Sequence, residues 1–314
     1  MEAALYDPAA GFFATTGRAG RAGGDFLTSV EVGSLFGALI ARAIDGWWEG
    51  VGRPDPFLVV DAGAGRGQLA RDVLRAGPRC APALRYVLVE RSATLRAEAA
   101  EHLPLEPAEL ALGPAVPPEP DEEPVGVPGS GPMVTALADL PAGPATGAVV
   151  ANELADNLPF RIVERTGAGW SEVRVGEGSG AFSEVVLPAD EDLAASADRL
   201  AEDSDIPVGA RLPVPTSLSD WLRSAAGMLR RGVVAVVDYG APVEELAVRG
   251  QAGWLRTFRG QRRGGSPLEA PGSQDITADV PAEALRRAAA AAGLAVITET
   301  TQADWLRSLG VEEL

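Results

Sequence analysis

The stretch that decides the fold is Phe57 to Leu74, FLVVDAGAGRGQLARDVL. Its first six residues, Phe57 to Ala62, are almost all apolar and predict a buried strand. A helical pattern, Gly67 to Ala76, follows a turn that has a glycine at every second position: Gly63, Gly65 and Gly67. Because glycine adopts backbone conformations that other residues avoid, this spacing predicts a sharp turn that a ligand can approach closely.

The residues around the glycine turn indicate which ligand it holds. The dinucleotide fingerprint needs its third glycine one position later, where this chain has Gln68. Asp61 precedes the turn and can accept a hydrogen bond from a ligand amine, which S-adenosylmethionine carries on its methionine part. Glu90 ends the next predicted strand, where such folds bind ribose hydroxyls. The alternative is a turn that only closes a strand–helix junction, and the combination of Asp61, Glu90 and three glycines argues against it.

The rest of the chain repeats the alternation of strands and helices. Ser92 is a suitable N-cap for the helix that follows the second strand. Further buried strands are predicted at 84–90, 147–152 and 232–240, and a late strand at 294–300. Helices are predicted at 32–48, 217–231, 281–292 and 301–310. Apolar strands alternating with helices predict an α/β fold whose mostly parallel sheet is covered on both faces.

Four segments differ from this alternation. Residues 1–50 are expected to form an N-terminal helical segment, and 51–314 the main domain. Within the main domain, 104–132 is rich in proline and acidic residues, which predicts an exposed loop. An insertion is expected at about 160–231, where alternating stretches over 160–187 predict antiparallel strands. Residues 250–277 are predicted to form a long loop.

The composition excludes several kinds of chemistry. All 27 basic residues are arginine, and the absence of lysine removes Schiff-base chemistry and the P-loop lysine. The single histidine, His102, is predicted to lie on the surface, which argues against a Ser-His-Asp triad and a histidine-rich metal site, so no metal is expected. The net charge of -17 argues against a nucleic-acid groove. It favours a soluble surface, with an acidic site for a cationic substrate as the alternative.

No part of the sequence predicts a membrane span or a disulfide. No apolar run reaches membrane-spanning length, and Cys80 is the only cysteine. The first residues, MEAALYDPAAGFF, lack the pattern of a signal peptide. A cytoplasmic protein is therefore expected.

A second group of polar residues follows the third predicted strand. Asn152, Glu153, Asp156 and Asn157 lie at the carboxyl end of that strand, where open α/β sheets bind ligands. Adenine and cytosine amino-methyltransferases have a D/N-P-P-Y/F motif here, and the N-E-L-A of this chain argues against a nucleobase substrate. The two carboxylates suit a guanidinium, which they can pair with bidentately. The alternative is that they cap the following turn.

Several motifs together resemble the MidA family of S-adenosylmethionine (SAM)-dependent methyltransferases. In chain order they are GDFLTS, DAGAGRGQLARDVL, LVERSATLR, ANELADNLPF, VVDYG, LRTF, PLEAPGSQDIT and TQADWL, between about Leu5 and Leu309. The resemblance implies a class I, Rossmann-like methyltransferase fold with added elements, and SAM as cofactor. Because the mitochondrial relative in this family dimethylates an arginine of a complex I subunit, it also implies a protein partner that presents an arginine.

The resemblance assigns roles to individual residues. It implies that Gly63, Gly65, Gly67 and Glu90 bind the cofactor and that Asp25 and Phe26 lie near it. It also implies that 152–156 line the substrate side. Within that stretch we expect Asn152 to bind the cofactor, and Glu153 and Asp156 to be the catalytic residues. We expect the N-terminal segment to fold over the cofactor as a lid, with Asp25 and Ser29 facing inward.

Three positions depart from the family pattern. Val30 stands where the family usually has proline, and Gln261 and Asp279 stand where it commonly has histidine. These differences concern the substrate more than the cofactor. Three functions therefore stay open: a SAM-dependent protein arginine methyltransferase, a SAM-dependent small-molecule methyltransferase, and a SAM-binding assembly factor without catalysis. The oligomeric state is left open.

Overall fold

The chain is divided into two compact units, each assembled from separate segments. The computed structural model describes residues 1–15, 34–113, 129–178, 180–259 and 262–313. Unit 1 comprises Met1–Phe26, Glu153–Arg223 and Asp238–Val296, and unit 2 comprises Leu27–Asn152, Ser224–Val237 and Ile297–Leu314. These bounds differ from the predicted division at residue 50. None of the described helices is both long and apolar enough to cross a membrane.

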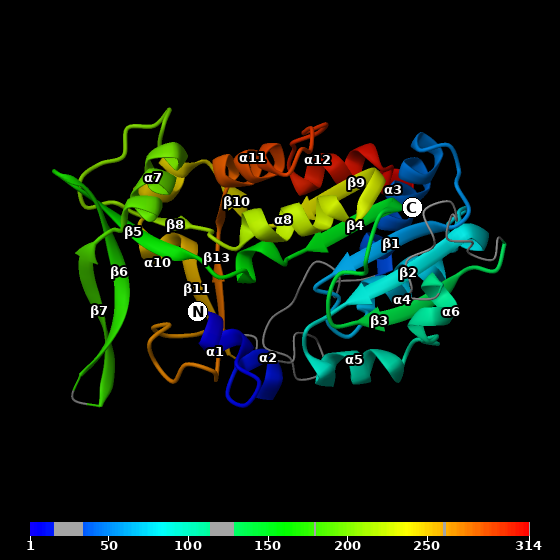
Figure 1. The fold of residues 1–314 in the computed structure, drawn as a ribbon, viewed down its shortest axis with the longest axis horizontal. Helices are drawn as coiled ribbons and strands as arrows, with labels where there is room; N and C mark the ends of the chain where they lie inside the picture. The colour runs from blue at the N-terminus through cyan, green and yellow to red at the C-terminus, as the bar shows by residue number, and fades with distance from the viewer. Residues whose placement is uncertain (16–33, 114–128, 179, 260–261, 314) are drawn as a thin grey trace. The chain divides into compact units, whose positions relative to one another are not determined.

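Unit 2 is built on a parallel sheet of five strands in the order β3-β2-β1-β4-β9 (Figure 1). The strands are β1 Phe57–Ala62, β2 Leu84–Val89, β3 Met133–Leu137, β4 Ala145–Asn152 and β9 Leu229–Val237. Both β1 and β2 are buried along their whole length, as their apolar sequences predict. In the register of this sheet, Asp61 lies opposite Leu88 of β2 and Val150 of β4. The predicted mostly parallel sheet is therefore confirmed.

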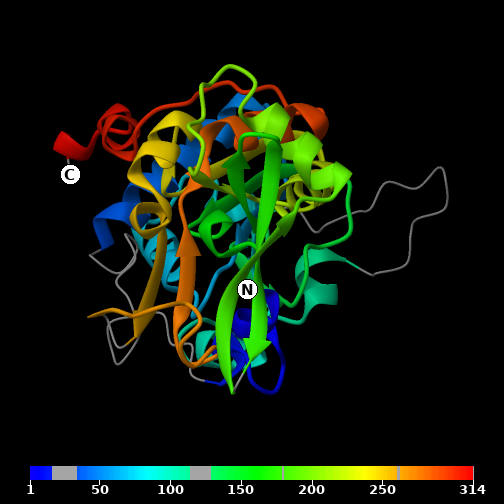
Figure 2. The same cartoon turned by 90° about the vertical axis from the view of Figure 1, so that its left-hand side faces the viewer.

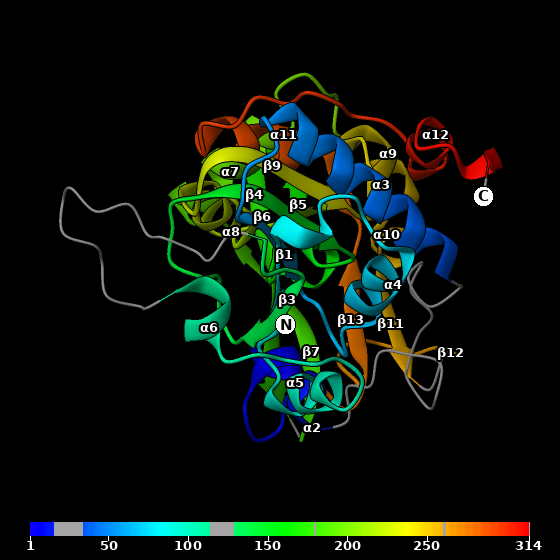
Figure 3. The same cartoon turned by 90° about the vertical axis from the view of Figure 1, so that its right-hand side faces the viewer.

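Helices of unit 2 pack against this sheet around one apolar core (Figure 3). Ile40 of α3, Val73 of α4 and Tyr86 of β2 are fully buried in it, together with Cys80. Ser92 caps α5, as predicted, and its hydroxyl accepts a hydrogen bond from the Leu95 amide at 3.3 Å. The elements are α3 Ser34–Gly50, α4 Gln68–Ala76, η2 Ala81–Ala83, α5 Ala93–Ala100, α6 Ala108–Leu112, α12 Gln302–Ser308 and η4 Val311–Glu313.

Unit 1 contains the predicted antiparallel insertion. Four strands pair in the order β7-β6-β5-β8, and Figure 2 shows the β6–β7 hairpin in front. Leu193 and Leu200 of α7 are buried in the same apolar cluster as Trp170 of β6. The elements are β5 Arg161–Thr166, β6 Gly169–Gly178, β7 Ala181–Pro188, α7 Glu191–Leu200 and β8 Arg211–Val214. All eight residues of β7, the strand at one edge of this sheet, are exposed.

Unit 1 also contains a second, smaller sheet of three antiparallel strands, β12-β11-β13. Its strands are β11 Leu255–Arg259, β12 Arg262–Arg263 and β13 Asp275–Ala278, and β10 Gly240–Ala241 pairs with β14 Val280–Pro281. The helices are α1 Glu2–Tyr6, α2 Phe12–Thr15, η3 Ala155–Asn157, α9 Val243–Arg249, α10 Gln251–Trp254 and α11 Ala282–Ala291. The remaining helix, α8 Leu218–Gly227, spans a boundary between the units.

Four sequence predictions need correction. The predicted loop 250–277 contains α10 and the three strands of the smaller sheet. The predicted helix 217–231 ends at Gly227, because Leu229 already pairs with Ala145 of β4. Residues 294–300 form no strand, and Ile297 is 76% exposed. The predicted loop 104–132 includes α6, and its residues 114–128 lie outside the described part of the chain.

Candidate active site

The glycine turn after β1 has the backbone geometry that its sequence predicts. The φ angles of Gly63, Gly65 and Gly67 are +75°, +54° and +72°, a region that favours glycine. Gly67 is the N-cap of α4, and a Cβ atom there would lie 2.6 Å from Leu103 and 2.7 Å from Leu88. A Cβ atom at Gly65 would meet no atom within 4 Å. Gly67 is thus required for packing, whereas Gly65 faces open space in which a ligand can approach the backbone.

Glu90 joins the glycine turn to the end of β2. One oxygen of its carboxylate accepts a hydrogen bond from the Gly65 amide at 3.0 Å, and the other accepts one from the Ser92 amide at 2.8 Å. Burial raises the pKa of Glu90, and these amide hydrogen bonds oppose the rise. A carboxylate has about four acceptor sites, so Glu90 keeps capacity for ribose hydroxyls.

Asp61 is buried in unit 2 with only 3% of its surface exposed. Its carboxylate accepts a hydrogen bond from the Tyr86 hydroxyl at 3.2 Å. Burial raises the pKa of Asp61 to about 7, against the lowering effect of that hydrogen bond, and the charge of Glu90 adds to the rise. The predicted contact between Asp61 and a ligand amine stays a prediction.

Asn152, the last residue of β4, has a side-chain oxygen that could accept a hydrogen bond from a ligand. Its Oδ1 atom is buried and has no hydrogen-bond partner among the described residues. A buried carbonyl oxygen without a partner costs about 1–3 kcal/mol, and a ligand that donates to it removes this cost. The free space at Gly65, the acceptors of Glu90 and this amide fit the amine and hydroxyl groups of SAM. Asp25, Phe26 and Ser29, also predicted to face the cofactor, lie outside the described residues.

Unit 1 brings the predicted catalytic pair together with a third carboxylate. Glu153 has a φ of +52°, which is uncommon for a residue with a side chain and typical of functional sites. Asp156 lies in η3, and Asp238 follows β9 in the chain. One oxygen of Asp238 accepts hydrogen bonds from the amides of Ala155 and Asp156, at 2.7 and 3.3 Å. Asp238, rather than the predicted pair, therefore caps the turn after Glu153. We call Glu153, Asp156 and Asp238 the acidic cluster.

The acidic cluster is electrostatically strained. Asp156 is 4% exposed, and its Oδ1 atom is buried without a hydrogen-bond partner among the described residues. Burial raises the pKa of Asp156 well above its usual value, and the nearby charges of Asp238, Asp275 and Glu153 add to the rise. Burial likewise raises the pKa of Asp238 to about 7. A cationic group in the cluster would supply both the missing donor and the missing charge.

An arginine pair and a tyrosine lie near the acidic cluster within unit 1. Asp279 accepts a hydrogen bond from Arg256 and forms an ion pair with Arg249 at 2.8 Å. The Arg256 guanidinium lies 5.5 Å from the centre of the Tyr239 ring. Burial, followed by the charges of Glu153 and Asp156, raises the pKa of Tyr239. Asp279, which stands where the resembling family commonly has histidine, is therefore a buried partner of two arginines. Gln261 lies outside the described residues.

Sequence reasoning missed Asp238, Tyr239 and Arg256. The signal for Asp238 and Tyr239 was present, because both directly follow a strand that ends in an apolar run, as Glu153 follows β4. The strand before them, β9, was predicted to be buried, but its residues are partly or fully exposed. Arg256 lies in the segment that was predicted to be a loop. Its signal was the alternation of Leu255 and Thr257, which are buried, with residues that are partly exposed.

Comparisons with known proteins identify a family and several relatives of this chain. Residues 39–300 match the model of a family of S-adenosyl-L-methionine-dependent methyltransferases. The chain is 28% identical over 311 residues to the mitochondrial protein arginine methyltransferase NDUFAF7 homolog of Drosophila melanogaster, covering 93% of this chain and 66% of that protein. It is 29% identical over 329 residues to mitochondrial NDUFAF7 of Mus musculus, covering 99% of this chain and 70% of that protein.

A solved structure extends the similarity to the fold. A methyl transferase superfamily member from Burkholderia thailandensis, in complex with S-adenosyl-homocysteine, superposes with a TM-score of 0.80 at 30% identity. The match covers 99% of this chain and 76% of that chain.

Proposed function

The chain belongs to this family of S-adenosyl-L-methionine-dependent methyltransferases, and from this premise we propose that it methylates an arginine side chain of a protein. The names of the fly and mouse relatives, protein arginine methyltransferases, support the choice of acceptor. The observation that carries the proposal is the acidic cluster, in which the buried Oδ1 atom of Asp156 has no partner among the described residues.

The cofactor is S-adenosylmethionine, whose sulfonium supplies the methyl group when it is bound. The open space at Gly65 leaves room for the cofactor to approach the backbone of the turn, and Glu90 would hold ribose hydroxyls. Asn152 would accept a hydrogen bond through its buried carbonyl oxygen. Because the sulfonium is already an activated group, the protein contributes mainly alignment and electrostatic stabilisation.

The acidic cluster makes an arginine a better nucleophile. A protonated guanidinium reacts poorly because its lone pairs are delocalised. Carboxylates on two of its nitrogens draw the positive charge toward them and leave the third nitrogen able to attack. Glu153 and Asp156 are the pair proposed for this role. Asp238 fixes the backbone of the turn that follows Glu153 by accepting hydrogen bonds from the amides of Ala155 and Asp156. The attacking nitrogen gains the methyl group as the bond between that group and sulfur breaks, and a carboxylate of the acidic cluster would take the proton that the nitrogen loses. This arrangement therefore needs no histidine base.

A single substitution tests the role of Glu153. Glu153→Gln should keep affinity for S-adenosylhomocysteine and lower methyl transfer by about 10²–10⁴-fold, the usual scale for a lost electrostatic group. Transfer is measured with tritiated SAM on a lysate of a strain that lacks the gene, with protein and small-molecule fractions separated. Hydrolysis of the labelled protein should release methylarginine.

The control is Glu244→Gln, which neutralises an exposed carboxylate of α9. It should leave both binding and transfer unchanged. Label that appears only in the small-molecule fraction would point to a small-molecule acceptor, and undiminished transfer by Glu153→Gln would remove Glu153 from the mechanism. No label in either fraction would favour a non-catalytic assembly factor. The cytoplasmic location predicted from the sequence stays a prediction, and the relatives are named mitochondrial.

A further inference from the structure

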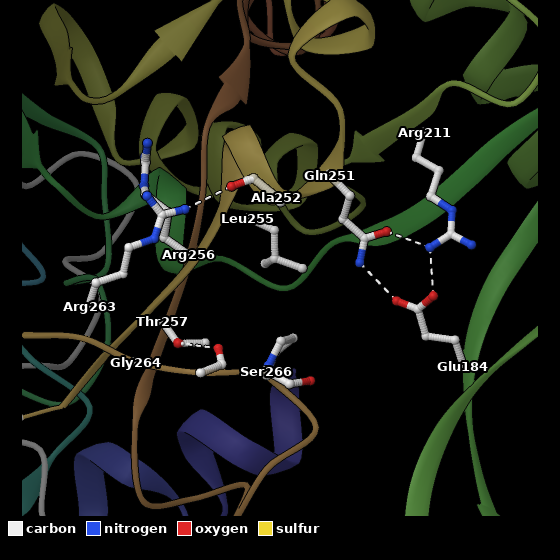
Figure 4. A pocket seen from close by; sticks show the side chains of 12 residues that line it. Glu184, Arg211, Gln251, Ala252, Leu255, Arg256, Thr257, Arg263, Gly264 and Ser266 are labelled. Carbon is white, nitrogen blue, oxygen red and sulfur yellow. Dashed lines mark hydrogen bonds and ion pairs between the residues drawn. The ribbon is translucent and has the colours of Figure 1, made fainter.

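Unit 1 contains a pocket that the proposed function does not use. It has a volume of about 370 Å³, within the range of small-ligand sites. Figure 4 shows it between β11, the turn at 264–267 and residues of β7, β8 and α10. Three of its twelve lining residues are arginines, Arg211, Arg256 and Arg263, in a chain whose net charge is -17. Among the described residues of the lining, Glu184 is the only carboxylate.

The acceptors in the pocket wall are already occupied. The two oxygens of Glu184 accept hydrogen bonds from Arg211 at 2.6 Å and from Gln251 at 2.9 Å. The amide oxygen of Gln251 accepts a further bond from Arg211 at 2.7 Å. Figure 4 shows these three side chains turned toward one another. The negative charge of Glu184 is therefore already paired with the positive charge of Arg211 and is not open to a cationic ligand.

The donors in the wall are only partly used. Arg263 donates one hydrogen bond, to the carbonyl oxygen of Ala252 at 2.8 Å, and no described carboxylate pairs with it. A guanidinium has five N–H donors, so most of its capacity is left. Arg256 shares the single carboxylate of Asp279 with Arg249. The groups that remain open to a ligand are therefore the N–H donors of positively charged guanidinium groups, and a carboxylate is the ligand group that matches them.

An exposed apolar strip continues from the pocket along the β6–β7 hairpin. Phe182, Glu184 and Val186 alternate along β7 and so face the same side of the sheet, and Val175 of β6 lies opposite Glu184. Phe182, Val186 and Val175 are 46%, 45% and 59% exposed. Because exposed apolar residues beside a polar pocket are typical of surfaces that bind polypeptides, this strip favours a polypeptide over a free small molecule.

We propose that this pocket binds the carboxylate of an aspartate or glutamate in an extended segment of the protein substrate. Arg263 and Arg256 would hold the carboxylate, and the strip at Val175, Phe182 and Val186 would contact apolar residues on either side of it. Arg256 also stacks on Tyr239, which follows Asp238 of the acidic cluster. The acidic residue would thus bind near the acceptor arginine. This last step rests on the proposed function, whereas the carboxylate site does not.

Binding can be tested without methyl transfer. The full-length protein, labelled with ¹⁵N-arginine, is titrated with N-acetylglutamate, N-acetylglutamine and inorganic phosphate while the arginine side-chain signals are followed by NMR. N-acetylglutamate should shift the signals of Arg263 and Arg256, and N-acetylglutamine should not. The peptide acetyl-Val-Thr-Glu-Thr-Val-amide, whose valines share a face with its glutamate when extended, should bind more tightly than N-acetylglutamate.

Two neighbouring arginines provide the matched variants. Arg263→Gln should weaken N-acetylglutamate binding about tenfold, as expected for a lost charged hydrogen bond. Arg262→Gln removes the same charge from the same exposed strand, outside the pocket lining, and should change the affinity less than about twofold. Arg263→Lys keeps the charge and should give an intermediate affinity. Val186→Ser should remove only the extra affinity of the peptide.

Several outcomes would overturn the inference. Equal binding of N-acetylglutamate and N-acetylglutamine, or equal losses in the Arg262 and Arg263 variants, would exclude a carboxylate site. Tighter binding of phosphate would assign the pocket to a phosphate ligand instead. A peptide no tighter than N-acetylglutamate would exclude the polypeptide. Confirmed binding in a protein that yields no methylarginine would reject the proposed function and leave the carboxylate site standing.

Discussion

Gly65 has a φ of +54° and open space where a side chain would begin. Gly65→Val should therefore abolish binding of S-adenosylhomocysteine, because a branched side chain would fill the space that the ligand needs. Calorimetry measures the loss. The control is Gly77→Val, which has the same kind of backbone, φ +67°, and the same open space at the end of α4. Gly77→Val should cost similar stability but keep binding, and equal binding losses in both variants would assign the effect to backbone strain alone.

Asp61 should make the stability of the protein depend on pH. Burial raises its folded-state pKa to about 7 from 3.8. Its contribution to stability is therefore complete below about pH 4 and is lost as the pH rises through about 7. As the pH rises from about 4 to about 7, the free energy of unfolding of the wild type should fall relative to that of Asp61→Asn by an amount on the order of a few kcal/mol. Urea unfolding at a series of pH values measures this difference, and parallel pH profiles for the two proteins would contradict the assignment.

Single residues also mark the limit of what the sequence predicts about the site. The glycine turn and Glu90 follow from spacing, because strand ends and turn residues leave a local signal. The positive φ of Glu153 leaves none. The turn that follows Glu153 is held by the Asp238 carboxylate, which accepts hydrogen bonds from two of its amides from 83 and 82 positions away. Contacts over such a separation depend on how the strands are ordered, which periodicity does not give.

At the scale of helices, α3 and α4 pack closely through one glycine. A Cβ atom at Gly37 would lie 2.4 Å from the Cβ atom of Asp72, whereas one at Gly46 of the same helix would meet nothing within 4 Å. Gly37→Ala should therefore destabilise the protein by about 1–3 kcal/mol. Gly46→Ala should stabilise it by roughly 0.5–1 kcal/mol, because alanine favours a helix. Denaturant midpoints test both, and two changes of the same sign would show that the helices do not meet at Gly37.

The same scale shows which elements sequence periodicity identifies. The strands β1, β2 and β4 lie within one or two residues of their predicted ends because each contains a short, mostly apolar stretch with a clear end. The smaller sheet escaped prediction because β11 and β13 are four or five residues long and stabilised by pairing with each other. Residues 294–300 show the opposite error, since a strand-like composition does not form a strand without a partner strand.

At the scale of the whole chain, the negative net charge and the arginines of the pocket would act on different parts of a substrate. A net charge of -17 attracts basic segments of a substrate, an effect that added salt screens. Arg263 and Arg256 of the pocket would then select, among such segments, those that also carry an acidic residue. The negative surface of the protein would thus attract basic segments, and its positively charged pocket would select those that contain an acidic residue.

Cys80 allows the rate at which the core of unit 2 opens to be measured. The thiol is fully buried, and burial, helped by the charge of Asp45, raises its pKa to about 12. Because the thiolate is the reactive species, an alkylating reagent should modify the native protein only when the core around Cys80 opens. With a single cysteine in the chain, one mass increment per molecule reports that opening. Gly37→Ala should accelerate alkylation and Gly46→Ala should slow it. Rapid alkylation of the intact native protein would contradict the burial of this residue.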